Sequence, residues 1–498
     1  MNNYTKISIY LSLLITVFLI LPKLTHAADF YVDPVNGSMS NDGSQAHPWS
    51  TLPAVWAAGK IHTYHYTDIG TWQVLAEKYP SGVVHAGDTI YLMSGYNGTL
   101  NLLGAVNTDY ITIKAYPGEI PTFKNIWIAG AAYWKIEGIK VSTEFSGTIT
   151  QFINGLIQIE NHSNQGPCNH ITIKDSEIYS INDDSAWTTL LDWYNHASTG
   201  IITAGTYTTI DNVLIRNVAI GVGLQSAAHS TFQNSTINRF AADAVAGGGT
   251  WSADMSYISV LNNTIINAVP AWEVHADTHG DMIQFSSLSK LDTYPIDHLV
   301  ISGNYVNPFE EYGINPMVSA ISNQGITMTN GLLTNALIDN NVVVVNSPHG
   351  ISIWGAVDST IINNTIIRAR DDVAYQNPTI LITRSTGGAS TPPSGNVVRN
   401  NISPAYTLLN SGWGVADHNL TVVNGENYSN YFTNVSNSSW DVRLKSGAAA
   451  IGAGSATLAP ATDIAGRTRE IPPSIGAYEY IPSGDITPPA APTGLSVL

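Results

Sequence analysis

The chain has little charge for its length and almost no cysteine. Only 11% of its 498 residues are charged, well below the quarter or so that soluble proteins usually carry. The single cysteine, Cys168, excludes an intramolecular disulfide, so stability has to come from packing. Cys168 is predicted to be a core residue, because a catalytic thiol needs a positioned base and none is legible nearby. Asn, Ser, Thr and Gly replace the missing charges, which suits β-turns and argues against long surface helices.

Basic residues are scarce in particular. The chain has 20 Lys and Arg against 37 Asp and Glu, so its formal charge is −17. A nucleic-acid-binding protein should be basic, and this balance therefore speaks against DNA or RNA as a partner. It also disfavours a polyanionic substrate, unless Ca²⁺ or a local basic patch offsets the repulsion.

The one long apolar run lies at the N-terminus. Lys6 precedes the apolar stretch 7–21, which is too short for a comfortable membrane span. Thr25-His26-Ala27 then places small residues at a cleavage site. This pattern predicts a signal peptide over residues 1–27, cut after Ala27, and a secreted protein that is extracellular or periplasmic; an uncleaved anchor is the alternative. No later segment is apolar enough to span a membrane, so none is expected in the mature chain.

The chain does contain a repeated motif, Asn-x-x-(Ile/Val). It begins at Asn217, Asn234, Asn262, Asn340 and Asn363, with variants at Asp175, Gly303 and Asn400. Each copy is short, β-branched and flanked by Gly, Asn or Ser, so the repeated unit is a strand plus a turn. Repeats at such spacings stack as equivalent turns. The sequence therefore predicts an all-β fold, a parallel β-solenoid with a long open face that suits a polymer.

Changes in composition along the chain predict five segments. They are a signal peptide (1–27), an N-terminal strand and cap (28–86), the β-helix coils (87–438), a C-terminal closing segment (439–480) and a Pro- and Gly-rich tail or linker remnant (481–498). A cap is expected because terminal repeats must hide an otherwise exposed core edge. The tail includes Asp485-Ile-Thr-Pro-Pro, which looks like the lead-in to a fibronectin type III module.

Three further stretches carry a likeness to a known superfamily. They are the entry Phe30-Tyr-Val-Asp-Pro with His47-Pro-Trp, the Asn-Asn-Thr-Ile coils, and the exit Asp463-Ile-Ala-Gly-Arg with Ile475-Gly-Ala-Tyr-Glu. In these the mature chain resembles secreted right-handed parallel β-helix proteins of the pectin-lyase-like superfamily. The resemblance implies a right-handed parallel β-helix that acts on carbohydrate. It bears less on chemistry, because that superfamily includes lyases, hydrolases, epimerases, tailspikes and adhesins.

The densest group of polar side chains runs from Glu273 to Gln284. His275, Asp277, His279 and Asp281 alternate within it, and in an extended strand all four would lie on one face. The coil here is unusually long, and insertions in a repeat protein usually build the binding surface.

Alignment of successive coils extends this group into a column. After each repeat a second strand is predicted to open, at Asp243, Asp281, Gly313 and Gly350. Asp243 and Asp281 then occupy equivalent positions roughly 5 Å apart, and Tyr312 and His349 precede the opening in later coils. The predicted catalytic residues on this face are His279, Asp281, Asp243, Tyr312 and His349.

Three roles are open for the column. Paired carboxylates can serve as general acid and base in glycoside hydrolysis. Asp243, Asp277 and Asp281 can bind Ca²⁺ through their oxygens. In a lyase, His279 or Tyr312 would abstract the C5 proton while Ca²⁺ or an Arg neutralises the uronate carboxylate. The structural alternative is that these residues only cap turns; a transition-metal site is disfavoured, because alternate residues on one strand seldom converge on one ion.

Arg and aromatic side chains near the column are the natural substrate contacts. Arg binds carboxylates bidentately, and aromatic faces stack on pyranose rings. The predicted substrate contacts are Arg239, Arg370, His275, Gln284, Trp187 and Trp354. Arg239 and Arg370 are also read as ordinary surface ion pairs.

Together these features predict a secreted enzyme that cleaves an extracellular polysaccharide. The leading hypothesis is β-elimination on a uronic-acid-containing glycan, with Ca²⁺ as the expected cofactor. The rival is a glycoside hydrolase that uses Asp243 and Asp281, which the acidic composition favours. A third hypothesis is a non-catalytic, glycan-binding surface adhesin. The polysaccharide is the expected partner in each case, and no feature of the sequence specifies an oligomeric state.

Overall fold

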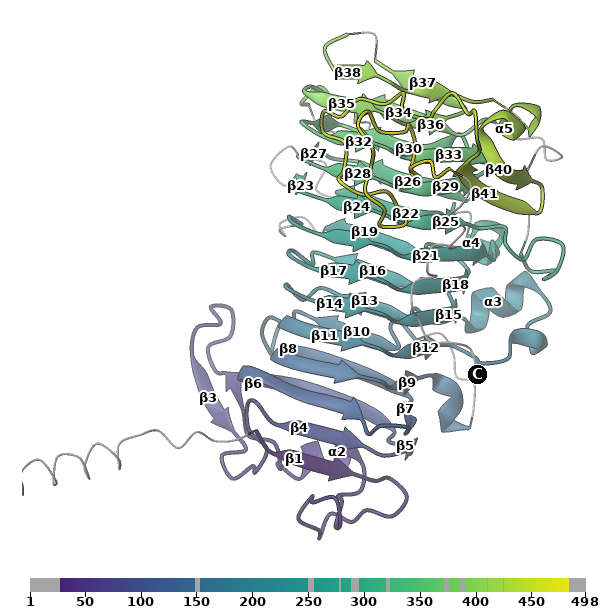
Figure 1. Ribbon diagram of the computed structural model, residues 1–498. Helices are drawn as coiled ribbons and strands as arrows, with labels where there is room; N and C mark the ends of the chain where they lie inside the picture. The colour runs from purple at the N-terminus through teal and green to yellow at the C-terminus, as the bar shows by residue number, and fades with distance from the viewer. Residues whose placement is uncertain are drawn as a thin grey trace, which may run out of the picture.

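The computed structural model describes residues 27–147, 153–249, 255–276, 279–287, 295–318, 323–370, 376–385, 390–409, 411–423 and 425–482. The predicted signal peptide, apart from Ala27, and most of the predicted tail lie outside the described residues. Over the described part the chain winds into an elongated stack of coils (Figure 1). None of its described helices has the length and apolar character to cross a membrane.

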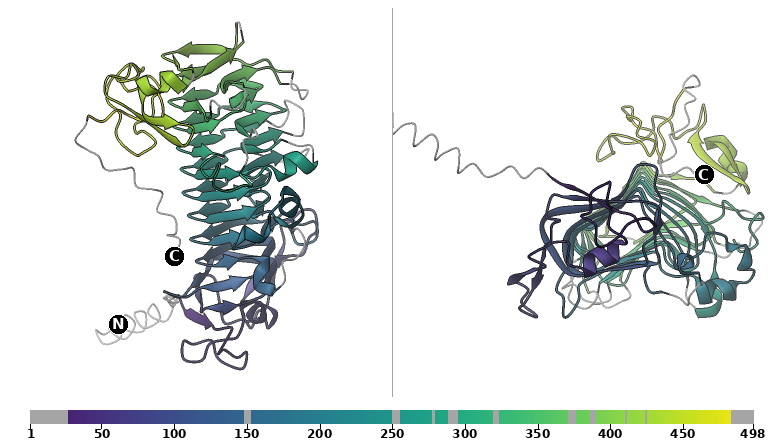
Figure 2. Two further views of the ribbon diagram at one scale, coloured as in Figure 1. Left: turned by 90° about the vertical axis from the view of Figure 1, so that its right-hand side faces the viewer. Right: turned by 90° about the horizontal axis from the view of Figure 1, so that it is seen from below.

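Each regular coil contributes three strands, which stack into three parallel faces that we call A, B and C (Figures 1 and 2). Face A consists of β10 (Ile157–Glu160), β13 (Ile201–Thr203), β16 (Val222–Gln225), β19 (Val245–Gly249), β22 (Asp281–Ser287), β26 (Gln324–Thr329), β30 (His349–Trp354), β34 (Thr379–Thr383) and β37 (Ala405–Leu408). Face B consists of β11 (Asn169–Lys174), β14 (Thr209–Asp211), β17 (Thr231–Gln233), β20 (Ser259–Leu261), β24 (Val300–Ser302), β28 (Leu337–Asp339), β32 (Thr360–Ile362), β35 (Asn396–Arg399) and β38 (Gly414–Asp417).

Face C is a separate sheet on the third side. Its strands are β5 (Gly95–Tyr96), β7 (Pro121–Phe123), β9 (Lys140–Val141), β12 (Glu177–Tyr179), β15 (Leu214–Val218), β18 (Thr236–Phe240), β21 (Thr264–Ala268), β25 (Tyr305–Asn307), β29 (Val342–Val345), β33 (Thr365–Arg368), β36 (Ile402–Ser403) and β39 (Leu420–Thr421). Faces A and B are joined near the N-terminus, because β6 (Thr99–Ala115) and β8 (Asn125–Glu137) run through both. These parallel ladders confirm the predicted parallel β-helix.

The core is a set of apolar columns that run along the stack. Ile210, Phe232 and Val260 pair in register on successive strands of face B, and all three are fully buried. In-register stacking puts like side chains above one another, so β-branched and aromatic residues pack efficiently at each coil. The alternating apolar pattern of the repeats therefore fixes which side of each strand faces inward.

The repeated Asn opens the turn between faces B and C. Asn234, Asn262 and Asn340 have φ of 51°, 54° and 54°, a left-handed conformation that Asn adopts more readily than most residues. One predicted copy was wrong. In the coil of β15 this place belongs to Asn212 (φ 52°), because Leu214 pairs with Thr236, whereas Asn217 lies buried inside the strand.

The residue after this Asn forms an internal ladder. Asn263, Asn304, Asn341, Asn364 and Asn401 are buried one above another. The backbone N–H of each donates to Oδ1 of the side chain in the next coil at 3.0 Å, as from Asn304 to Asn341. The ladder satisfies polar groups that the core would otherwise leave without partners.

A second ladder lies outside the turn between faces A and B. Tyr133, His170, Tyr207, His229, Tyr257 and His298 stack ring on ring, with centroids 4.5–4.9 Å apart. Each has a positive φ, from 53° to 60°, which directs every ring the same way. The stack follows the coil spacing of about 4.8 Å. The small strands β23 (Ile296–Asp297), β27 (Leu333–Thr334) and β31 (Ala356–Val357) lie at the same corner.

The N-terminal region belongs partly to the stack. β1 (Asp29–Val32) pairs in parallel with β4 (Thr89–Leu92), so it is already a strand of the solenoid. The helix α2 (Leu52–Ala57) buries Trp56 edge-on against Trp134. An antiparallel pair, β2 (Thr63–Tyr66) and β3 (Leu75–Lys78), extends beside β6.

The C-terminal region folds back along the side of the last coils (Figure 2). It begins with α5 (Gly425–Tyr431) and an antiparallel pair, β40 (Phe432–Ser436) and β41 (Ser439–Leu444). Residues 445–482 then cross the turns between faces B and C. The side-chain amides of Asn340, Asn363 and Asn400 donate to backbone carbonyls of this segment.

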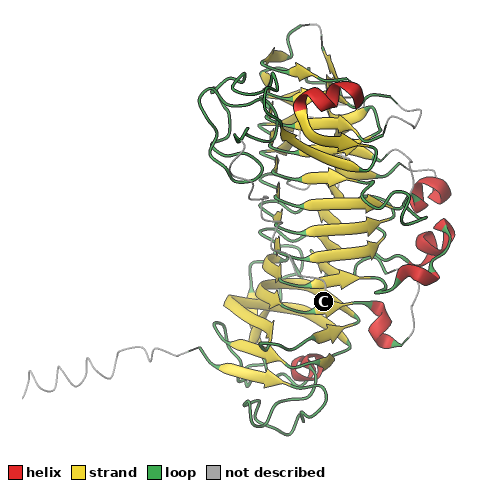
Figure 3. Cartoon of the chain, turned by 45° about the vertical axis from the view of Figure 1, so that its right-hand side comes forward, coloured by secondary structure: helices red, strands yellow, loops and turns green. Residues whose placement is uncertain are grey.

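The turn between faces C and A carries the longest connections. The helices α3 (Leu190–His196) and α4 (Ala271–Ala276) and the short helices η1 (Thr143–Ser146) and η2 (Asp184–Ala186) lie there (Figure 3). Residues 308–318 form a further loop between β25 and β26. These loops line one long edge of an otherwise regular stack, and the candidate site lies at that edge.

Candidate active site

The start of face A brings the predicted column together. Val245, Ile283 and Ile326 pair in register on β19, β22 and β26, which places Asp243 and Asp281 at equivalent positions in adjacent coils, as the alignment predicts. The backbone N–H of Asp281 donates to Oδ1 of Asp243 at 2.9 Å. His349 occupies the start of β30, two coils further along.

Asp281 is the fixed centre of the site. It is fully buried, yet its two carboxylate oxygens are well supplied with hydrogen bonds. Oδ1 accepts from Thr327 Oγ1 at 2.9 Å, and Oδ2 accepts from Gln284 Nε2 at 2.7 Å and contacts His279 Nδ1 at 2.9 Å. A carboxylate held this way is poorly placed to attack a substrate. Its contact with Nδ1 instead orients the imidazole of His279.

His279 stands at the rim of the site. Its side chain is 54% exposed, and the contact with Asp281 uses Nδ1, so Nε2 is the nitrogen available to a substrate. The hydrogen bond to Asp281 raises the pKa of His279, helped by the charges of Asp281, Asp243 and Glu273, while burial opposes the shift. An exposed imidazole oriented by a buried carboxylate is suited to proton transfer.

Asp243 provides a second titrating group. Burial, together with the charge of Asp281, raises the pKa of Asp243 to about 7, although the N–H of Asp281 and the charge of His279 act in the opposite direction. Near pH 7 this carboxyl group therefore keeps its proton in part of the molecules. It can donate that proton to a departing oxygen.

Glu273 joins this group from the helix α4. Burial raises the pKa of its half-buried carboxyl group, and His279 and Asp281 both influence it electrostatically. Its Oε2 atom is buried without a hydrogen-bond partner among the described residues. The sequence prediction did not include Glu273 in the site, although this residue begins the polar stretch that was singled out.

His349 and Trp354 lie further along face A. Nδ1 of His349 lies 3.0 Å from Ser352 Oγ, and the imidazole meets Trp354 edge-on at 5.4 Å. Burial is the largest influence on the pKa of His349 and lowers it. The charge of Asp281 raises this pKa by less, and the charge of His279 lowers it further. A largely neutral imidazole beside a partly exposed indole suits binding of a sugar ring more than proton transfer.

Tyr312 does not belong to the column. The strand in its coil opens at Gln324, not at Gly313, and Asp281 pairs with Gln324. Tyr312 instead lies in the loop before β26, beneath the guanidinium of Arg370 at 4.0 Å. The prediction failed because Gly313-Ile314 resembles a strand opening, whereas Ile314 is 83% exposed in a turn.

The predicted extended face over His275–Asp281 is also wrong. Residues 271–276 form α4, whose first hydrogen bond runs from the N–H of Val274 to the carbonyl of Pro270. Pro is favoured at such a helix start. The ring of His275 therefore lies against Tyr194, with centroids 5.5 Å apart, and Asp277 lies outside the described residues.

Three predicted substrate contacts instead hold the loops. Arg239 bonds both oxygens of Glu311, at 2.8 and 2.9 Å, and Asp184 at 3.1 Å, so its guanidinium is not open to a substrate carboxylate. Arg370 donates to the carbonyl of Asn437 at 2.8 Å as well as covering Tyr312. Trp187 is 5% exposed and packs edge-on against Trp193, so its face is unavailable to a sugar.

Asp281, one of the residues predicted to bind Ca²⁺, fits the ion poorly, because both of its oxygens are engaged by protein donors and Ca²⁺ needs accessible oxygens. Asp277, another of them, lies outside the described residues. Among the described residues, no group of three or more His, Cys, Asp or Glu is arranged to hold a metal ion.

The fold and site together define a parallel β-helix protein with an acid–base cluster at one corner. No protein-family model matches the chain, and no curated protein matches it. Among solved structures the chain is similar to the pectate lyase Pel9A (15% identity, TM-score 0.48, covering 92% of this chain and 98% of that one). It is also similar to a glycoside hydrolase (8%, 0.46, 80% and 98%) and to a mannuronic-acid-specific family 6 polysaccharide lyase from human gut microbiota (12%, 0.37, 77% and 83%).

The raised pKa of Asp243 predicts that the site costs stability at high pH. An unfolded Asp titrates near pH 4 and folded Asp243 near pH 7, so the folded state binds the extra proton between these values, and stability falls as pH rises through that window. Asn at this position keeps an acceptor for the N–H of Asp281 and does not ionise. Asp243→Asn is therefore expected to raise Tm by roughly 1–3 °C more at pH 8 than at pH 4.

Asp297 is the matched control, because its pKa is shifted in the opposite direction from that of Asp243. Burial alone would raise its pKa, but hydrogen bonds from Thr334, Asn335 and His298 outweigh burial and lower it. Because this pKa is lowered from an ordinary value already below pH 4, Asp297→Asn should lower Tm by about the same amount at pH 8 as at pH 4. Differential scanning fluorimetry of both variants at both pH values tests the assignment, and an equal Tm change for Asp243→Asn at pH 4 and pH 8 would contradict it.

Proposed function

We propose that the protein is a secreted carbohydrate-active enzyme that cleaves a polysaccharide at the corner between faces C and A. The observation that carries the proposal is the exposed imidazole of His279, held at Nδ1 by the fully buried Asp281, beside the carboxyl of Asp243. A stack of coils behind this corner offers a long surface to a long polymer. A buried carboxylate is costly, and its placement behind an exposed imidazole is what acid–base catalysis requires.

Within this class the geometry favours glycoside hydrolysis. His279 Nε2 takes a proton from water as the water oxygen attacks the anomeric carbon, and the bond to the glycosidic oxygen breaks. Asp243 gives its proton to that leaving oxygen. The charged groups that act on His279 are all carboxyls, from Asp281, Asp243 and Glu273, and such an environment repels a uronate. Glu273, on α4, is placed to assist at the same imidazole.

β-Elimination is the second candidate, because the base is an imidazole next to an acid. In that reaction His279 would remove the C5 proton of a uronate, the bond from C4 to the glycosidic oxygen would break, and Asp243 would protonate the leaving oxygen. Arg239, predicted as a carboxylate ligand, is already paired with Glu311 and Asp184. A non-catalytic adhesin is the remaining alternative, and it gains nothing from this pairing of buried and exposed groups.

The products distinguish the candidates. The full chain is incubated with neutral polysaccharides (xylan, galactomannan, β-glucan) and with polyuronates (alginate, polygalacturonate), and reducing ends and ultraviolet absorbance are followed in parallel. We expect new reducing ends without absorbance, on a neutral glycan. Absorbance from an unsaturated uronate end would show that the reaction is elimination and not hydrolysis. Binding without either product would favour the adhesin.

A further inference from the structure

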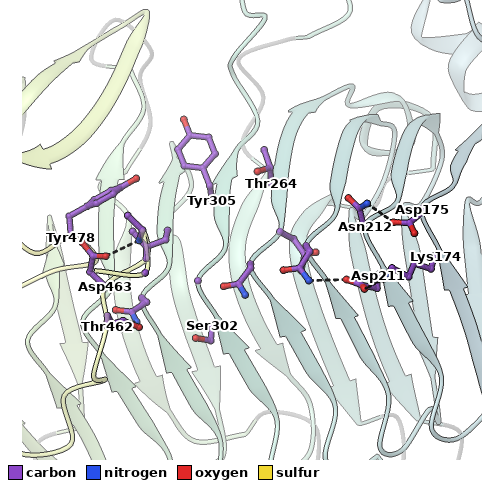
Figure 4. Close-up of a pocket in the computed structure, with 18 residues that line it drawn as sticks. Lys174, Asp175, Asp211, Asn212, Thr264, Ser302, Tyr305, Thr462, Asp463 and Tyr478 are labelled. Carbon is purple, nitrogen blue, oxygen red and sulfur yellow. Dashed lines mark hydrogen bonds and ion pairs between the residues drawn. The ribbon is translucent and has the colours of Figure 1, made fainter. Parts of the chain in front are cut away.

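A groove runs along the corner between faces B and C, on the opposite edge of face C from His279. Its volume is about 890 Å³ (Figure 4). It crosses the left-handed turn positions of successive coils, at Asp175, Asn212, Asn234, Asn262 and Asn340. At one end it meets the C-terminal segment, where Asp463 and Tyr478 contribute to its wall.

The protein itself shows what this row of turns can bind. Further along the same row, the side-chain amides of Asn340, Asn363 and Asn400 donate to carbonyls of residues 455–476, at 2.8–3.1 Å. The turns and bends of this segment thus lie across several coils and accept a hydrogen bond from each. The carboxamides of Asn212, Asn234 and Asn262 occupy the equivalent positions in earlier coils and face the groove.

The polar groups in the groove alternate between donors and acceptors. Asn212 Nδ2 donates to Asp175 Oδ1 at 2.6 Å, and Asn234 Nδ2 donates to Asp211 Oδ1 at 2.8 Å. Asn212 Oδ1 is buried without a partner among the described residues. Each coil therefore adds an amide or carboxyl group about 4.8 Å from the last, a repeat close to the length of one pyranose residue in an extended glycan.

The charge of the groove narrows the ligand class. The carboxylates of Asp175 and Asp211 meet one lysine, Lys174, which lies 3.6 Å from Asp211. A polyuronate would bring like charge to this wall, whereas the hydroxyls of a neutral glycan both donate to carboxylates and accept from amides. Tyr305 and Tyr478 supply aromatic surface at the side of the groove (Figure 4).

The structure assigns this groove as a second binding site, for an extended strand of neutral glycan, separate from the cluster at His279. The assignment rests on the proposed function only in taking a glycan, and not a polypeptide, as the ligand. The groove lies at the turns that precede the strands of face C and His279 at the turns that follow them, so a polymer held in the groove stays near His279 without covering it.

The test is affinity gel electrophoresis of the full chain through xylan, galactomannan or β-glucan, with alginate and polygalacturonate as acidic probes. All proteins carry His279→Ala, so that the probe stays intact. The double change Asn212→Gly and Asn234→Gly removes the amides and keeps a residue that tolerates the left-handed turn. Asn335→Gly is the matched control, since Asn335 has φ 53° and lies exposed at the corner between faces A and B.

The double variant should weaken binding of at least one neutral polysaccharide by about tenfold, because two hydrogen-bonding side chains are lost. The control should match the parent. Equal retardation of the double variant and the control overturns the assignment, as does retardation by acidic probes alone or by none of the neutral ones. Retention of cleavage by His279→Ala would refute the proposed function and leave this comparison intact.

Discussion

Replacement of His279 by Ala is expected to lower kcat on the cleaved polysaccharide by about 10²–10⁴-fold, the usual contribution of a positioned acid–base group. The imidazole is the one group of the cluster that is both oriented by a buried carboxylate and largely exposed. Its removal takes away the proton acceptor and leaves the strands of face A in place. Because the imidazole is largely exposed, Tm should change little. Initial rates and a thermal melt of the same preparation test this.

The chain offers a close control for that experiment. His298 also sits at a corner, with Nδ1 2.7 Å from a carboxylate oxygen of Asp297, and its side chain is 43% exposed. His298→Ala removes the same chemical pair at the corner between faces A and B, away from the cluster at His279, and it should leave kcat within about twofold. A loss of activity as large as that of His279→Ala would show that the effect is structural, and it would sink the catalytic assignment.

Asp281→Asn separates positioning from proton transfer. An amide keeps one acceptor oxygen, for Thr327 or for Gln284, and no longer holds the imidazole as a charged partner. Because Asp281 helps to raise the pKa of His279, the variant should move the corresponding limb of the pH–rate profile to lower pH. A merely structural role for Asp281 would lower activity equally at every pH.

The sequence predicts the fold well and the site only in part, for one physical reason. A position that recurs once per coil is placed by the register of the parallel strands. The repeats therefore predict the stacked coils and the adjacency of Asp243 and Asp281. Inserted loops escape that constraint. Tyr312 and His275 were misplaced because the segments before β26 and β22 are such insertions, and Glu273 was overlooked because nothing in the repeats indicates that α4 folds over His279.

Replacement of Asn341 by Ala in the ladder is expected to destabilise the fold by about 2–4 kcal/mol. Asn341 is fully buried, and its side chain accepts from the N–H of Asn304 and donates to the carbonyl of Ile301 and to Asn364. Alanine leaves these groups unpaired in an apolar interior that water does not reach. A lowered thermal midpoint, with early proteolysis of the neighbouring coils, is the expected signature.

The earlier coils indicate which replacement should rescue part of that loss. The ladder position of Asn341 is occupied by Ser in the coil of β18, where Ser235 Oγ accepts the N–H of Val213 at 3.1 Å. Asn341→Ser therefore restores an acceptor for the N–H of Asn304, and its midpoint should fall between those of the parent and Asn341→Ala. Asn430→Ala, on the exposed side of α5, should leave the midpoint unchanged. If the Ser variant were no more stable than the Ala variant, the ladder would stabilise the fold through the volume of its side chains and not through their hydrogen bonds. The repeated Asn would then contribute by packing.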